Sequence, residues 1–227
     1  FDFKPKRIGV PRDFLKQEGL DREVLENFDK SLEKLKKLGY EIVDIKLPNA
    51  KYAMPVYYIL MPAEASTNLS RFDGVRYGAQ VKGKNLLDTY NKTRGEGFGR
   101  EVRRRIMLGT YVLSHGYYDA YYNKANKVRA LIEQEFIKAF DVKNGGVDAI
   151  ATPTNPTPAF KIGEKSKNPL AMYLSDIFTV PANIAGIPAI SIPVGKSKDG
   201  LPLDLHLSAS HFREDILFTI GKEFENI

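Results

Sequence analysis

A chain of 227 residues, 43% hydrophobic and 27% charged, has the composition of a globular protein and can bury a sizeable core. The net charge is +6, but the basic residues are spread along the chain, so a solvated basic surface is favoured over a dedicated nucleic-acid surface. The lack of cysteine excludes disulfides and thiolate zinc sites and suits a reducing compartment, and three scattered histidines fit no metal motif.

The first part of the chain predicts a βαβ unit. Arg7 to Pro11 has the pattern of a short buried strand, and Asp21 can cap a helix that runs to about Lys37. Residues 41–47 then alternate between apolar and polar, as in a second strand. A strand, a helix and a strand within this length favour a parallel pair and an α/β class.

The remainder predicts helices followed by short strands. Helices are expected over residues 52–69, 85–90, 103–113, 117–139, 171–178 and 213–224, and strands over 147–151, 189–193 and 203–207. A proline-rich loop, residues 152–158, follows the first of these strands. The C-terminal end of a strand is where ligands usually bind in α/β sheets, so this loop is a candidate site. No apolar run approaches the roughly 18 residues of a membrane span.

Three alternating glycines, Gly95, Gly97 and Gly99, precede a run of three arginines, Arg103 to Arg105. Such a loop can cradle a phosphate, but a nucleotide-binding fold would place a strand directly before it, and none is predicted. A tight turn is therefore favoured. The arginines are expected at the start of a helix, where positive charge is electrostatically unfavourable, and residues 106–113 look buried.

Arg105 is the arginine expected to point inward, because it shares a helix face with Gly109 and Val112, whereas helical neighbours point about 100° apart. Its counterion is either a carboxylate of the protein, in a structural ion pair, or a carboxylate of a ligand. Asp176 lies in the apolar stretch MYLSDIF and needs a partner if buried, and Tyr57 is interpreted by default as core packing. No Gly-x-Ser-x-Gly motif and no credible nucleophile with a base is present.

Three long segments carry a family resemblance: EASTNLSRFDGVRYG at 64–78, RGEGFGREVRRRIMLGTYVLSHGYYDAYY at 94–122, and NPLAMYLSDIFTVPANIAGIPAISIP at 168–193. They resemble the amidase signature family, in particular its glutamyl-tRNA(Gln) amidotransferase A subunits. The resemblance covers essentially the whole chain. It implies an α/β fold with a mixed central sheet flanked by helices, with residues 1–227 forming the C-terminal half of a single amidase-signature domain.

The resemblance also implies which catalytic residues and subunits lie outside this chain. The family's Ser-cisSer-Lys triad and its Gly-Ser-Ser-Gly-Gly signature match nothing here, and the chain begins with Phe1, which suggests a piece of a longer protein. No catalytic residue is therefore expected in this chain. In the family, the serine attacks the glutamine amide, and ammonia passes to a B subunit that uses ATP and magnesium to amidate Glu-tRNA(Gln), while a C subunit braces the pair. A cytoplasmic protein with no metal, cofactor or membrane contact of its own is expected.

Carried over residue by residue, the resemblance makes Arg105 the ligand of the glutamine α-carboxylate, Asp176 the ligand of its α-ammonium, and Tyr57 a wall of the pocket. Asp204 and His206 depart from the family pattern Gly-Leu-Pro-x-Gly-Leu-Gln, which puts the geometry of that strand in doubt. His206 is given no catalytic role. Two other functions stay open: an amidase for another small amide, with a structural arginine, and a non-catalytic module that binds tRNA or a protein partner.

Overall fold

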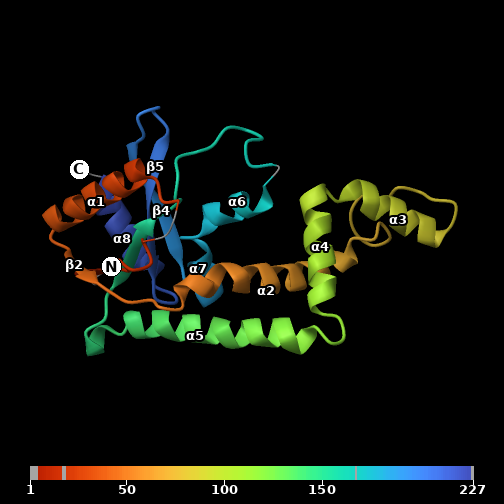
Figure 1. The fold of residues 1–227 in the computed structure, drawn as a ribbon, viewed down its shortest axis with the longest axis horizontal. Coiled ribbons are helices and arrows are strands. Elements are labelled where there is room, and N and C mark those ends of the chain that lie inside the picture. The colour runs from red at the N-terminus through yellow and green to blue at the C-terminus, as the bar shows by residue number, and fades with distance from the viewer. Residues whose placement is uncertain (1–4, 17–18, 167, 226–227) are drawn as a thin grey trace. The chain divides into compact units, whose positions relative to one another are not determined.

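The computed structural model describes residues 5–16, 19–166 and 168–225. It divides into two compact units, which we call the sheet unit (residues 1–54 and 129–227) and the helical unit (residues 55–128). Figure 1 shows the helices and strands of both.

A five-stranded mixed sheet, in the order β2-β1-β3-β5-β4, forms the centre of the sheet unit. β1 pairs in parallel with β2 and β3, and β5 is antiparallel to both β3 and β4. The expected α/β class and mixed sheet are confirmed. The strands are β1 (Arg7–Val10), β2 (Glu41–Asp44), β3 (Ala149–Pro153), β4 (Ala189–Lys196) and β5 (Pro202–Ala209).

The predicted βαβ unit is present, with α1 (Arg22–Lys37) between β1 and β2. The Asp21 carboxylate accepts a hydrogen bond from the Glu23 N–H at 2.7 Å, which caps the helix as expected. Its apolar face is buried, and Gly39 at φ +93° ends the helix in a conformation that favours glycine. The second strand is shorter than predicted and ends at Asp44.

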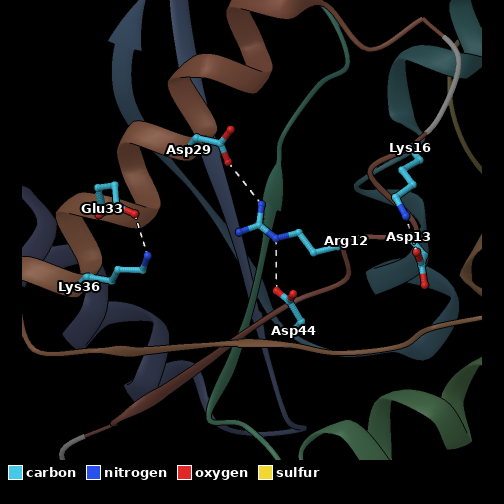
Figure 2. Close-up of polar contacts among 7 residues, drawn as sticks. All are labelled: Arg12, Asp13, Lys16, Asp29, Glu33, Lys36 and Asp44. Atoms are coloured by element: carbon cyan, nitrogen blue, oxygen red, sulfur yellow. Dashed lines mark hydrogen bonds and ion pairs between the residues drawn. The ribbon is translucent and has the colours of Figure 1, made fainter.

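Arg12, just after β1, lies between two acidic residues of the same unit. Its Nη1 is 3.3 Å from Asp29 on α1, and its Nε is 3.2 Å from Asp44 at the end of β2 (Figure 2). All three side chains are well exposed, so each ion pair contributes less than about 1 kcal/mol to stability. Two further surface pairs in Figure 2, Lys16 with Asp13 and Lys36 with Glu33, have the same character.

In the same unit α8 (Glu214–Glu225) packs against β4 and β5, and the helices between β3 and β4 are short. The expected helix at 171–178 is instead α6 (Pro169–Tyr173) followed by a 3₁₀ turn (Leu174–Asp176), and α7 (Val180–Ala185) follows. The expected strand at 147–151 begins two residues later, at Ala149. The buried Asp148 instead accepts hydrogen bonds from the N–H groups of Lys6 and Arg7, at 2.8 and 2.9 Å.

Helices dominate the helical unit. They are α2 (Ala53–Asn68, which begins in the sheet unit), a 3₁₀ turn (Leu69–Arg71), α3 (Leu86–Gly97), α4 (Arg100–Val112), a π-helix (Tyr118–Asn123) and the start of α5 (Lys124–Ala139, which continues in the sheet unit). α2 continues through Pro62 as one element, and Pro55 lies in its first turn. The single helix predicted at 117–139 is thus a π-helix that leads directly into α5.

The prediction of a glycine turn was wrong for Gly95 and Gly97, because both lie inside α3. The Asn85 side chain accepts a hydrogen bond from the Asp88 N–H at 2.9 Å and caps this helix. Once a helix is nucleated, continuing it through a glycine costs only about 1 kcal/mol. The helix therefore runs beyond residue 90, its expected end, and only Gly99 lies between helices, as the N-cap of α4.

Two expectations for the arginine helix were also wrong. α4 begins at Arg100, so Arg103 to Arg105 follow the first three helical residues, and Glu101 supplies the negative charge that a helix N-terminus favours. The segment after the arginines is mostly exposed: Met107, Leu108 and Tyr111 are 72%, 42% and 47% accessible. In α4, Gly109 and Val112 are the buried positions, so burial is confined to one narrow face.

Candidate functional site

Arg105 lies on the buried face of α4 together with Gly109 and Val112, as predicted. Its side chain is 31% exposed, and Nε donates a hydrogen bond to Glu101 Oε1 at 3.0 Å. Nη1 lies 3.6 Å from Met61 Sδ on α2, a weak acceptor. The structure therefore contains the ion pair that the sequence left open as one alternative. A guanidinium has five N–H donors, so one bond to Glu101 does not exhaust its binding capacity.

The surroundings of Arg105 keep its guanidinium protonated and positively charged. Burial lowers the pKa of Arg105, but the hydrogen bond and charge of Glu101, with smaller contributions from Tyr57 and Tyr58, raise that pKa above its ordinary value overall. Arg105 is thus cationic at every physiological pH. Glu101 also pairs with Arg104, whose Nη1 lies 2.6 Å from Oε2. The i,i+4 spacing of Glu101 and Arg105 is a signal from which the sequence could have predicted this pair.

Tyr57 lies on α2, half-buried, with its ring edge-on to that of Tyr58 at a centroid distance of 5.1 Å. Its hydroxyl contributes, after Glu101, to the raised pKa of Arg105. Their helices approach closely at Gly109, where a Cβ atom would lie 1.9 Å from the Pro62 carbonyl oxygen. The structure thus brings two of the three predicted site residues together within the helical unit.

Asp176, the third predicted residue, belongs to the sheet unit. The helix expected around it is a 3₁₀ turn at this point, and Asp176 is exposed at the end of that turn while Ser175 and Phe178 turn inward. Its backbone carbonyl accepts hydrogen bonds from the N–H and Oγ1 of Thr179, at 3.1 and 3.2 Å. The pairing of Asp176 with Arg105 across a bound zwitterion stays a prediction.

A cavity of about 380 Å³ opens in the sheet unit beside the loop that follows β3. Its polar lining comes from Thr154, Asn155 and Thr157 on that loop, from Ser175 and from Asp204. Thr154 Oγ1 lies 2.9 Å from Ser191 Oγ, and Asn155 Nδ2 donates to the Ser175 carbonyl at 3.0 Å. The loop at the C-terminal end of this strand therefore borders a hollow, as its place in an α/β sheet suggests. Sequence reasoning did not single out Asn155 or Ser175.

Asp204 and His206 both lie on β5 and differ in their surroundings. Asp204 pairs with Pro193 of β4 where a register shift begins, so the strand is irregular there. His206 is paired regularly, with Thr152 on β3 and Ser191 on β4. It is 7% exposed, its Nδ1 lies 3.3 Å from Thr152 Oγ1, and burial lowers its pKa to about 4. The imidazole is thus neutral at pH 7.

His206 is expected to make stability depend on pH between about 6.5 and about 4. In this window the unfolded chain binds a proton at His206 that the folded chain excludes, so the free energy of unfolding falls as pH falls, by up to about 3 kcal/mol. Urea unfolding at several pH values, compared with His206→Gln, measures this. Above pH 7 the difference in unfolding free energy between the two proteins should be constant. Toward pH 4 the protein with His206 should lose stability relative to the His206→Gln variant. Parallel pH profiles would contradict it.

Among the residues described, no group of three histidine, aspartate or glutamate side chains could hold a metal ion. None of the helices in the described part of the chain is both long and apolar enough to cross a membrane.

Comparison with known proteins places these features in a family. The family model described as Amidase matches residues 2–218, and the chain belongs to this family. It is similar to the A subunit of glutamyl-tRNA(Gln) amidotransferase from Maricaulis maris, at 54% identity over 223 residues, which are 98% of this chain and 44% of that protein. The corresponding protein of Pelagibacter ubique is 53% identical over 224 residues, covering 99% of this chain and 45% of the relative. The chain thus spans less than half the length of these relatives.

Solved structures support the same family assignment. The crystal structure of the glutamyl-tRNA(Gln) amidotransferase A subunit from Thermotoga maritima matches with a TM-score of 0.72 at 40% identity, over 97% of this chain and 42% of that one. The allophanate hydrolase of Kluyveromyces lactis matches with a TM-score of 0.69 at 18% identity, covering 98% of this chain and 32% of the other, and shows the shared fold alone.

Proposed function

We propose that this chain is the C-terminal, glutamine-recognising part of the A subunit of a glutamyl-tRNA(Gln) amidotransferase. The observation that carries the proposal is the 54% identity to such a protein across 98% of the chain. The helical unit adds a physical reason. It holds a permanently charged guanidinium, Arg105, near a half-buried tyrosine, Tyr57, and a guanidinium can bind a carboxylate through two parallel hydrogen bonds.

In this proposal, Arg105 binds the α-carboxylate of glutamine, Asp176 binds its α-ammonium, and Tyr57 closes the pocket. A zwitterion held at both charges leaves its side-chain amide as the only mobile end, so the amide is directed to one place. The nucleophilic serine of the Ser-cisSer-Lys triad, which belongs to the rest of the A subunit, attacks that amide. This chain supplies selection and orientation, which can contribute several kcal/mol to lowering the barrier when the geometry is well set.

The rest of the assembly follows from the same proposal. The released ammonia is used by the B subunit, which holds ATP and magnesium and binds most of the Glu-tRNA(Gln), and a C subunit braces the other two. The reaction takes place in the cytoplasm, where translation consumes its product, Gln-tRNA(Gln).

Ammonia release from glutamine tests the proposal. The complete A subunit, in complex with B and C, is expected to release ammonia from glutamine, and this chain alone is expected to release none because it lacks the nucleophile. A simple aliphatic amide such as propionamide should be a poor substrate of the complete enzyme. If the complete enzyme preferred propionamide to glutamine, the protein would be a general amidase instead. Ammonia release by this chain alone would refute the proposed division of roles.

A further inference from the structure

Asp176 is exposed and stands at the end of a helical segment that is too short to be stable by itself. α6 has five residues and the 3₁₀ turn after it has three. Helices of this length are not stable in isolation, so their position depends on contacts from outside the segment. Two such contacts reach Ser175, the residue immediately before Asp176, which is 8% exposed.

The first contact comes from the loop after β3. Asn155 Nδ2 donates a hydrogen bond to the Ser175 carbonyl oxygen at 3.0 Å. This loop is itself held in place, because the Asp21 N–H at the start of α1 donates to the Pro156 carbonyl at 2.8 Å. Prolines at 153, 156 and 158 restrict the backbone further. Asn155 therefore links the 3₁₀ turn to the end of a central strand.

The second contact comes from a later position on the same loop, which runs from β3 to α6. Lys165 Nζ donates to Ser175 Oγ at 2.8 Å, and the ammonium also lies 4.2 Å from the centre of the Phe160 ring. The main chain and the side chain of Ser175 are thus hydrogen-bonded from two points, ten residues apart, on the one loop between β3 and α6. Each hydrogen bond restricts the conformation of Ser175, which directly precedes Asp176, the candidate ligand of the α-ammonium.

We infer that Asn155 and Lys165 are positioning residues that hold Asp176 where it can meet the α-ammonium of glutamine. The inference rests on the proposed function and adds to it two residues that act through Ser175. A displacement of about 1 Å in a residue that binds substrate can lower the rate a hundredfold. Loss of one of the two hydrogen bonds to Ser175 is therefore expected to lower activity on glutamine about tenfold. The loss should fall on substrates with an α-ammonium, because the α-ammonium is the group that the proposed function assigns to Asp176.

The test compares glutamine with glutaramate, which keeps the amide and the carboxylate but lacks the α-ammonium. The variants are Asn155→Ala, Lys165→Met and Asp176→Asn in the complete A subunit with its B and C partners. We expect Asn155→Ala and Lys165→Met each to raise the KM for glutamine about tenfold, with kcat changing less, and to lower the preference for glutamine over glutaramate. Lys165→Arg, which keeps a donor, should restore most of this preference. Lys161→Met, an exposed lysine of the same loop, should have no effect.

The outcomes separate the inference from the function on which it rests. If Asp176→Asn lowers the preference for glutamine and the Asn155 and Lys165 variants do not, the positioning role is wrong and the proposed function stands. If those variants lose equal activity on glutamine and glutaramate, their role is general stability and the inference is overturned. If Asp176→Asn leaves the preference unchanged, the proposed role of Asp176 fails, and the positioning role fails with it. Glutaramate turnover also reports whether each variant is folded.

Discussion

Arg105→Ala in the complete A subunit is expected to raise the KM for glutamine roughly a hundredfold, because a charge-assisted, bidentate contact with a carboxylate is worth about 3 kcal/mol. The matched substrate is 4-aminobutanamide, which is glutamine without its α-carboxylate. The variant should lose far more activity on glutamine than on this amide, so the ratio of the two kcat/KM values should fall. Steady-state ammonia release from both substrates measures the ratio.

Two control variants separate substrate binding from the ion pair seen in the structure. Arg103 is an exposed neighbour, and Arg103→Ala should leave the ratio unaltered. Glu101→Gln removes the negative charge that pairs with Arg105 but keeps the length of the side chain at residue 101. This substitution should lower stability by at most about 1 kcal/mol because the ion pair is partly exposed. If Arg105 is purely structural, Glu101→Gln and Arg105→Ala should have similar effects, and both substrates should suffer equally.

Gly109→Ala is expected to destabilise the protein by about 3 kcal/mol and to raise the KM for glutamine. An added Cβ atom would lie 1.9 Å from the Pro62 carbonyl oxygen and 2.4 Å from its carbonyl carbon. Both are backbone atoms that no side-chain rotation can move, so α4 must shift away from α2. Arg105 is one turn away on the same face of α4 and must shift as well. Chemical unfolding and glutamine kinetics on the same samples measure the two effects.

Gly95→Ala is the matched control, because Gly95 is also a helical glycine but has no heavy atom within 4 Å of an added Cβ. Alanine is the better helix former, so this substitution should stabilise the protein by about 0.5–1 kcal/mol. Similar destabilisation by both substitutions would show that glycine flexibility, not the close approach of α2 and α4, is what matters at residue 109.

The features that were correctly predicted depend on contacts close in the sequence. Asp21 caps α1, the helix ends at Gly39, and the alternation after it forms β2, because caps and periodicity act over a few residues. The inward direction of Arg105 follows from its helical spacing to Gly109 and Val112 alone. Family resemblance, rather than spacing, identified Asp176 and Tyr57 as candidates.

Burial was predicted less well than local structure, because it depends on partners that are distant in the sequence. Residues 106–113 were expected to be buried because they are apolar, but only a neighbouring element can bury a helix face. Gly109 and Val112 are the buried residues of α4, and α2 approaches the helix closely at Gly109. The apolar sequence around Asp176 did not decide whether this residue is buried, and the 3₁₀ turn places Ser175 inside and Asp176 at the surface.

By itself, the sequence determined the family, the α/β class, the order of the elements and the identity of the inward arginine, because these depend on local pattern and on long matching segments. Only the tertiary structure decided how much of α4 is covered, that Glu101 and Met61 contact Arg105, and that Asn155 and Lys165 meet at Ser175. The physical reason is that burial and hydrogen-bond partnership are properties of pairs of surfaces. Residues 155 and 165 lie 20 and 10 positions from residue 175, and no local pattern specifies that three such residues share one site.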